Sequence, residues 1–317
     1  MSNQSNNKGR GYEFACLKIL YNEILKYRSC FVEENASFVA TKNAWESLDE
    51  MQQANYLLSA ASVVDTLFDL EPLIIEESED ILELRIQPDS QGEIGDVRDI
   101  IMLRSGINWE IGLSIKHNHF AVKHSRLAKT LDFSEKWFGY PCTNTYWDCI
   151  SKIFEYLDYM KKQGKMWSEL SAKDQDVYVP LLKAFIDEIN IQNEINPKIP
   201  KKMVEYLLGE FDFYKVISID NRRTTQIQTF NLHGTLNQSS RTKKPNIEIP
   251  IVDLPTRIVS LDFKPNSSNT VELYLNNGWQ FSFRIHNAST YVETSLKFDI
   301  QIIGMPTTIV SISCEWK

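Results

Sequence analysis

Hydrophobic residues in the first third of the chain follow a helical period and then an extended one. Residues 10–28 and 41–70 place apolar side chains every three or four positions, which predicts an amphipathic helix followed by one or two more. Residues 81–87 alternate between apolar and polar side chains, as a half-buried strand does. The segments 97–104 and 107–116 continue this pattern across a tight turn. We therefore expect helices followed by a three-strand meander.

The remaining chain repeats the same order and then becomes strand-like. Residues 144–162 and 167–193 have helical patterns, and a shorter helix is expected at 201–209. Residues 213–219 predict another strand, and strand-like patterns continue from there to the last residue. This order predicts a mixed α/β (α+β) fold with helical insertions and a β-rich C-terminal region.

Length and composition favour one large domain with an appendage, or two domains. The chain has 317 residues, of which 43% are hydrophobic and 24% charged, the proportions of an ordinary globular protein rather than a disordered one. We place a catalytic core with helical insertions at 1–212. We place its last core strand and a β-rich recognition region at 213–317.

Charge is distributed unevenly along the chain. The formal net charge of −8 argues weakly against a nucleic-acid-binding protein, because phosphate neutralisation needs an excess of lysine and arginine. The average hides clusters, however. Residues 71–84 contain six acids and no lysine, and we expect them to form a solvated face. The stretches 116–129 and 221–245 contain basic residues and no acid.

Cysteine usage and the N-terminus point to the cytoplasm. The five cysteines show no Cys-x-x-Cys spacing and are expected to be free thiols in a reducing compartment. The first ten residues are polar and lack the apolar core of a secretory signal. No apolar run is long enough to span a membrane.

Asp99 and Lys116 are the candidate catalytic pair. Asp99 opens one strand of the meander and Lys116 ends the next, so a tight turn at 105–106 would bring both to one edge of the sheet. A carboxylate that binds a divalent metal and a lysine that polarises water are the groups that phosphodiester hydrolysis requires. The alternative is a surface salt bridge between neighbouring strands. The basic, histidine-rich segment that follows Lys116 favours the catalytic interpretation, because it would attract an anion.

Several motifs around this pair resemble the HaeIII-type restriction endonucleases. The most specific segments are GDVRDIIMLR at 95–104 and NWEIGLSIKHNHFAVKHSRL at 108–127. Supporting segments are KGRGYEFACLKIL at 8–20, LDFSEKWFGYPC at 131–142 and YVPLLKAFIDEI at 178–189. The resemblance covers nearly the whole chain. It implies a type II enzyme that cuts duplex DNA within GGCC in the middle, to blunt ends, using Mg²⁺. It also implies the αβββαβ core of the PD-(D/E)xK nuclease superfamily.

The resemblance assigns Asp99 to the first acid and Lys116 to the catalytic lysine, but the second acid is missing. Ser114 occupies the position two residues before the lysine, where the superfamily has Asp or Glu. Glu13 is the preferred replacement, because a helix before the meander often presents a glutamate to the metal in this superfamily. Asp96 is the reserve. Glu110 shares the strand face but lies roughly 20 Å from Lys116 at about 3.3 Å per residue, so a bulge would be needed to bring it close.

DNA contacts are expected from the two basic stretches. Arginine can read guanine in the major groove, amides can read other base edges, and lysine can bind phosphate. The alternative for 221–245 is a solvated strand face with a flexible loop. The candidate DNA-binding residues are Asn118, His119, Lys123, His124, Arg126, Arg222, Arg223, Gln226, Gln228, His233 and Arg241. We expect both stretches to share one concave face, with the acids of 71–84 turned away from it.

Other motifs predict less. His117 and His119 could chelate a metal, but the rest of a ββα-metal nuclease motif is absent. Pro141-Cys142 resembles the nucleophile of cytosine methyltransferases, yet no glycine-rich cofactor loop accompanies it.

The rival function is a catalytically silent DNA-binding or regulatory protein that keeps the nuclease fold. A palindromic site favours a homodimer, although a monomer that nicks each strand in turn remains an alternative. A cognate DNA methyltransferase would act on the same site.

Overall fold

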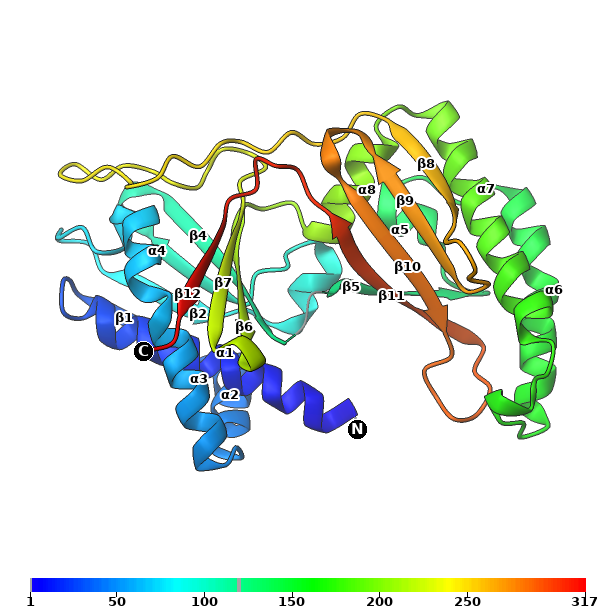
Figure 1. Cartoon of the computed structure of the whole chain (residues 1–317), viewed down its shortest axis with the longest axis horizontal. Coiled ribbons are helices and arrows are strands. Elements are labelled where there is room, and N and C mark those ends of the chain that lie inside the picture. The colour runs from blue at the N-terminus through cyan, green and yellow to red at the C-terminus, as the bar shows by residue number, and fades with distance from the viewer. Residues whose placement is uncertain (1, 119–120) are drawn as a thin grey trace. The chain divides into compact units, whose positions relative to one another are not determined.

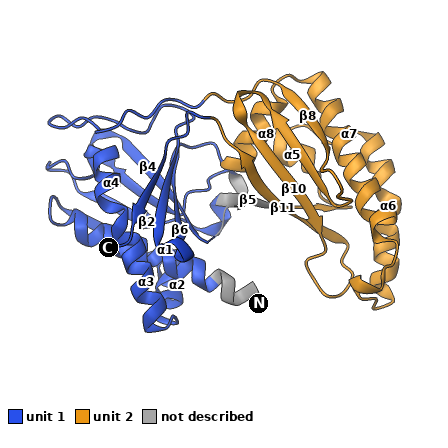
Figure 2. Ribbon diagram, viewed as in Figure 1, with its two compact units in different colours: residues 1–120, 209–252, 307–317 blue, residues 121–208, 253–306 orange. Residues whose placement is uncertain are grey.

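The computed structural model describes residues 2–118 and 121–317, which form two compact units (Figures 1 and 2). Unit 1 contains residues 1–120, 209–252 and 307–317, and unit 2 contains residues 121–208 and 253–306. Each unit is therefore discontinuous in sequence. The sequence-based boundary at 212/213 lies close to one of the four places where the chain passes between units. A single cut could not anticipate the other three, because local hydrophobic patterns do not show which distant segments pair.

Unit 1 has a seven-stranded mixed sheet in the order β1-β2-β3-β4-β6-β7-β12. The pairs β1/β2 and β4/β6 are parallel and the others are antiparallel. Its helices are α1 (Ser2–Ile24), α2 (Ala36–Glu46), α3 (Glu50–Ser62) and α4 (Val64–Leu70). Its strands are β1 (Cys30–Glu33), β2 (Leu82–Ile86), β3 (Ile100–Arg104), β4 (Trp109–His117), β6 (Phe213–Ile219), β7 (Thr224–Phe230) and β12 (Ser311–Glu315). Short 3₁₀ turns are Pro72–Ile74, Asp89–Ile94, Ser105–Ile107 and Asp220–Arg222.

Unit 2 has a five-stranded antiparallel sheet in the order β5-β11-β10-β9-β8. Its strands are β5 (Ala121–Ala128), β8 (Ile258–Phe263), β9 (Thr270–Leu275), β10 (Gln280–His286) and β11 (Ser295–Gly304). Its helices are α5 (Phe133–Phe138), α6 (Asn144–Lys162), α7 (Val179–Ile195) and α8 (Ile199–Leu208), with a π-helical turn at Asp174–Tyr178. Further 3₁₀ turns are Trp167–Glu169 and Asn276–Gly278.

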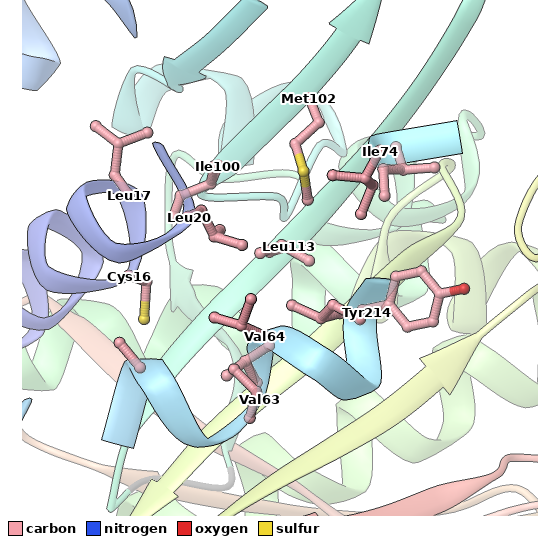
Figure 3. Close-up of a cluster of buried hydrophobic side chains, with 14 of the residues drawn as sticks. Cys16, Leu17, Leu20, Val63, Val64, Ile74, Ile100, Met102, Leu113 and Tyr214 are labelled. Atoms are coloured by element: carbon pink, nitrogen blue, oxygen red, sulfur yellow. The ribbon is translucent and has the colours of Figure 1, made fainter. Parts of the chain in front are cut away.

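The core of unit 1 lies between its helices and one face of its sheet. Leu17 and Leu20 of α1 point toward Ile100 and Leu113 of the central strands (Figure 3). All four side chains are at most 3% exposed. Side chains on β4 alternate between faces, so Leu113 is in this core while its neighbours along the strand face the other way. The helices thus fix the central strands and leave their second face for polar groups.

Unit 2 has an aromatic core of its own. Trp137 of α5 stacks on Tyr206 of α8 with ring centroids 4.8 Å apart, and Phe185 of α7 packs against Phe298 of β11 at 5.0 Å. Phe283 of β10 completes the cluster between helices and sheet. Aromatic pairs of this kind add stability beyond the area they bury.

The mixed α/β class is confirmed, and most predicted elements have the expected type. The meander is present as β2, β3 and β4, and the predicted strand at 213–219 is β6. The sequence missed the short strand β1, whose four residues are too few to establish a period. It also predicted strand from 231 to 257, where the structure has an irregular segment with no helix or strand. Side-chain contacts rather than a ladder hold that segment.

The acidic stretch 71–84 is not a solvated face, which corrects the prediction. The guanidinium group of Arg104, fully buried, bonds to Glu76 at 3.0 Å and to Asp80 at 2.9 Å. Arg28 binds Asp80 from another side at 2.9 Å. Hydrogen bonding from Arg104 holds the pKa of Asp80 well below its ordinary value. The acids are needed here because a buried arginine is costly without anionic partners.

The same stretch is also not turned away from the basic segment 221–245. Glu76 accepts a hydrogen bond from the backbone N–H of Arg241, and the Arg241 side chain lies 3.3 Å from it. Glu71 accepts from Tyr214 at 2.7 Å and from the backbone of Asn237. Opposite charges pair directly within unit 1, so the expected separation of the two charge clusters is wrong.

Candidate active site

Asp99 and Lys116 form a direct pair, as the meander predicts. The Lys116 ammonium donates to Oδ2 of Asp99 at 2.9 Å, and the backbone N–H of Ile115 donates to the same oxygen at 2.5 Å. The backbone N–H of Asp99 bonds to the carbonyl of Leu113 at 2.7 Å, which extends the ladder to the start of β3. Both side chains are about a quarter exposed, at 24% and 26%. The pair is therefore held by the sheet and still reachable by a substrate.

The register of the sheet places more polar groups on the same face. Ile100 pairs with Leu113, so Asp99 lies opposite Ser114, whose hydroxyl is 3.5 Å from Oδ2 of Asp99. On the other side of β4, Ser114 pairs with Lys215 of β6. Lys116 follows Ser114 by two residues and shares its face. A polar group thus stands on each of three adjacent strands.

The two charges of the pair stabilise each other. Burial would lower the pKa of Lys116, but the charge of Asp99, its hydrogen bond and the charge of Glu13 outweigh burial, and the pKa lies above its ordinary value. Lys116 is therefore an ammonium at neutral pH. It can donate hydrogen bonds to a phosphate or to an attacking water. It cannot act as a general base unless it first loses a proton, which its interactions with Asp99 and Glu13 disfavour.

Glu13 of α1 lies within electrostatic reach of this pair. Burial and the negative charge of Asp99 raise its pKa to about 8, although Lys116 and Arg10 act in the opposite direction. The preceding residue anchors this part of α1: Tyr12 is fully buried and its hydroxyl is 2.7 Å from that of Ser59. A carboxyl group whose ionisation is disfavoured by burial and by a nearby carboxylate is a place where a cation would be stabilised.

The other candidate acids are occupied elsewhere. Asp96 receives two hydrogen bonds from the Arg98 side chain, at 2.8 and 2.7 Å. Burial would raise the pKa of Asp96, but the bonds and charge of Arg98 hold it below its ordinary value. Glu110 pairs with Arg98 at 2.8 Å. The β3/β4 ladder runs without a bulge from Ile100/Leu113 to Arg104/Trp109, so Glu110 stays at the far end of the strand.

Three charged residues near the pair were missed by the sequence analysis. Lys215 is 5% exposed, and the charges of Lys116 and Asp99 both act on it. Asp89 acts electrostatically on Glu13 and Lys116, and it pairs with Arg10 at 2.6 Å. A signal for Lys215 was present, because a lysine inside the apolar strand FYKVISI is unusual. Asp89 and Arg10 gave no signal, since both lie in polar segments.

The donor set fits a hard divalent cation that also binds substrate. Among the residues the structure describes, no three His, Cys, Asp or Glu side chains are grouped as a metal site. Mg²⁺ commonly uses only one or two carboxylates and completes its coordination with water and substrate phosphate. Asp99 and Glu13 supply two hard oxygen donors. Burial and the negative charge of Asp99 raise the pKa of Glu13, and a bound cation would offset both effects.

Five candidate DNA-binding residues of unit 1 are exposed, and three of them also contact other side chains. The five are Asn118, Arg222, Arg223, His233 and Arg241. The Arg223 guanidinium group lies 5.6 Å from the centre of the Trp316 ring, so this side chain packs on the protein. Asn118 bonds to Asp220 through its side chain at 3.0 Å. Arg241 pairs with Glu76 as described above.

Gln226 and Gln228 lie on the same sheet face as the pair. Gln228 is opposite Lys215, and Gln226 is opposite Ile217, which itself pairs with Lys116. The two glutamines are 3.3 Å apart through their amide groups. The register therefore brings these two candidates onto the face that contains Asp99 and Lys116.

The stretch 116–129 spans both units. His119 lies outside the described residues, and the side chains of Lys123 and His124 are likewise outside the description. Arg126 of β5 is in unit 2, where it lies 3.7 Å from Glu293. The shared concave face for the two basic stretches thus stays a prediction.

The alternative chemistries receive no support from the described side chains. His117 bonds to Asp220 at 2.8 Å and to the Tyr56 hydroxyl at 3.3 Å, as an imidazole in a hydrogen-bonded network does. Cys142 is buried, and burial raises the pKa of its thiol. All five cysteines are free, as expected. No helix in residues 2–118 or 121–317 is long and apolar enough to cross a membrane.

The fold and the pair define a mixed α/β protein with a carboxylate–lysine site, and comparison identifies its family. The sequence matches the HaeIII restriction endonuclease family over residues 9–306. It is 52% identical, over 318 aligned positions covering all of both chains, to the type II restriction enzyme HaeIII of Haemophilus aegyptius. The chain therefore belongs to the HaeIII restriction endonuclease family and is a type II site-specific deoxyribonuclease. No solved structure matches it significantly.

Proposed function

We propose that the protein cleaves double-stranded DNA within GGCC, between the central G and C, to leave blunt ends in a Mg²⁺-dependent reaction. The family membership and the 52% identity to HaeIII support this activity. The observation on which the chemistry depends is the Lys116–Asp99 pair, 2.9 Å apart at the ends of two adjacent strands. We also infer that α1, the meander and β6 form part of the αβββαβ core of a PD-(D/E)xK nuclease.

Each residue of the site has a part in the proposed reaction. Asp99 and Glu13 would hold Mg²⁺, which supplies positive charge to the phosphate as negative charge builds on it. Lys116 donates a hydrogen bond either to the attacking water or to a phosphate oxygen, and this bond orients the group that accepts it. The Ile115 N–H fixes Asp99, so its carboxylate does not have to reorganise when DNA binds.

Plasmid cleavage tests this function. A plasmid with GGCC sites is incubated with the protein, with Mg²⁺ or with a chelator, and the fragment ends are sequenced. We expect blunt ends between G and C only with Mg²⁺. Cleavage at another sequence, or with chelator present, would contradict the site or the cofactor. The Asp99→Asn variant is the control for contaminating nucleases.

Family membership favours a deoxyribonuclease over the catalytically silent DNA-binding rival, and the same experiment distinguishes the two. That rival requires binding to the duplex with no cleavage under any metal. Ser114 in place of an acid motivated this rival, but Glu13, which interacts electrostatically with Asp99, is a candidate for the second acid and disfavours the rival.

We further propose that the protein acts as a homodimer in the cytoplasm, beside a methyltransferase that modifies the same site. A palindromic site has two-fold symmetry, which a two-fold dimer matches. Sedimentation of the protein with and without a duplex that contains one site tests this proposal. Binding of a single subunit to each duplex would favour successive nicking by a monomer.

A further inference from the structure

We infer that Lys215 is a second fixed cation of the catalytic site, which acts with Lys116 to position the scissile phosphate and stabilise the negative charge that develops on it. This inference rests on the proposed function, since it assumes that Asp99 and Lys116 are the catalytic pair. It adds a residue from β6 that lies outside the meander.

The sheet register places Lys215 beside the pair. Lys215 is directly opposite Ser114, and Ser114 is opposite Asp99, so the three side chains form a row across β3, β4 and β6. Neighbouring strands are about 4.8 Å apart, and paired side chains lie on one face. Lys116, two residues beyond Ser114, faces the same way. Two lysines therefore lie on the sheet face that contains Asp99.

Lys215 lies in a buried environment, which is costly for a cation. Its side chain is 5% exposed. Its neighbours on the same strand face, Phe213 and Ile217, are buried apolar residues, so an apolar residue would suit the position. Fold stability alone would favour such a replacement, because a buried ammonium pays a desolvation penalty. Residues kept at a cost to stability are typical of functional sites.

Charge interactions link Lys215 to the site. Burial and the positive charge of Lys116 lower its pKa to about 8, whereas the charge of Asp99 acts in the opposite direction. Most of the group remains protonated at neutral pH. Bound DNA would bring negative phosphate to two ammonium groups that otherwise repel each other, so the site is already charged for an anion before substrate arrives.

Substitutions at Lys215 test the inference. Single-turnover cleavage and thermal unfolding are measured for the full chain, for Lys215→Met and for Lys215→Arg, on whichever duplex the unmodified protein cuts. We expect Lys215→Met to reduce cleavage about 100-fold, as loss of one charge-stabilising group does. Its melting temperature should equal or exceed that of the unmodified protein. Lys215→Arg should recover cleavage to within about tenfold.

A second measurement separates an electrostatic role from a structural one. Without metal, binding of the cognate duplex by Lys215→Met should depend on salt with a slope about one unit smaller. The exposed Lys42 of α2, changed to Met, is the matched control and should change neither cleavage nor this slope. Cleavage by Lys215→Met within tenfold of normal would overturn the inference. The inference would also be overturned if Lys215→Met and Lys215→Arg lost melting temperature to the same extent and both lost cleavage, because loss of folding would then explain the lost activity.

Failure of this inference can be distinguished from failure of the proposed function. If the unmodified protein does not cut GGCC, the proposed recognition sequence is wrong, and this conclusion does not depend on the role of Lys215. If it cuts GGCC and Lys215→Met cuts equally well, only the role of Lys215 is wrong.

Discussion

Oδ2 of Asp99 receives a lysine ammonium and a backbone N–H at the same time. Changing Asp99 to Asn keeps the shape but replaces a charged metal ligand with a neutral amide. We expect duplex binding to persist and cleavage to fall by several orders of magnitude, because the metal contributes several kcal/mol of charge stabilisation. Binding titrations and single-turnover cleavage measure the two effects. Near-normal cleavage by Asp99→Asn would remove this residue from the metal site.

Glu13 and Glu110 provide a matched pair of substitutions. Glu13 interacts electrostatically with Asp99 and Lys116, whereas Glu110 is paired with Arg98. We expect Glu13→Gln to reduce cleavage at least about 100-fold through weaker metal binding. Glu110→Gln should leave cleavage within a few-fold of normal. The opposite pattern would show that β4 presents Glu110 to the metal after all.

At this scale the sequence could predict the pair but not its surroundings. Asp99 and Lys116 are placed by the length of two strands and the turn between them, all of which are local. Lys215 becomes a neighbour only through the parallel pairing of β4 and β6, whose partners lie about a hundred positions apart along the chain. Such pairings are fixed by tertiary packing, which local patterns do not encode.

At the scale of elements, Gly112 allows Arg98 to cross β4. A Cβ atom at this position would lie 2.1 Å from Cδ and 2.8 Å from Cβ of Arg98. We expect Gly112→Ala to lower the free energy of unfolding by about 1–3 kcal/mol, the usual cost of overpacking. Cleavage should fall too, because Arg98 precedes Asp99. Gly9→Ala, in open space on α1, is the control for thermal unfolding and should not destabilise.

Glu71, which binds the irregular segment 231–257 through Asn237, makes the stability of the protein depend on pH. Burial raises the pKa of Glu71 to about 7, although bonds from Tyr214 and Asn237 act in the opposite direction. The folded state holds the proton of the Glu71 carboxyl group more tightly than the unfolded chain does. The contribution of this proton to stability is therefore complete below about pH 4.5. It is lost as pH rises through about 7.

Glu71→Gln should remove this dependence. Relative to the unmodified protein, the variant should gain stability as pH rises from 5 to 8, by up to roughly 3 kcal/mol. Denaturant unfolding across this pH range measures the difference. Glu77→Gln, at an exposed position of the same stretch, should show no such trend. A constant difference between Glu71→Gln and the unmodified protein would contradict the raised pKa.

Element prediction from sequence succeeded where hydrophobic periods are long. The helix at 144–162 and the strand at 213–219 have the predicted bounds, since each extends over several repeats of its period. The segment 231–257 was expected to be strand-like as part of the β-rich C-terminal region. Its backbone is instead attached through side chains such as Asp212, which accepts from the N–H groups of Leu232 and His233.

For the whole molecule, the two units divide the candidate DNA contacts. Arg222 is exposed in unit 1 and Arg126 is exposed in unit 2. If Arg222 reads a base, Arg222→Ala should cost about 1–3 kcal/mol on the cognate duplex and much less on random DNA. If Arg126 contacts phosphate, Arg126→Ala should weaken both about equally and reduce the salt slope by about one unit. Titrations on both duplexes at several salt concentrations test this. Equal losses for Arg222→Ala would make it a phosphate contact.

The discontinuity of the units has a consequence for the newly synthesised chain. β4 pairs with β6 across residues 121–208, and β7 pairs with β12 across residues 253–306. During translation, each of these partners leaves the ribosome separated from the other by a whole portion of unit 2. Distant pairings of this kind form slowly, because long loops must close first. A nascent chain therefore has no finished seven-stranded sheet until β12 has emerged, and its unpaired strand edges are prone to aggregation until then.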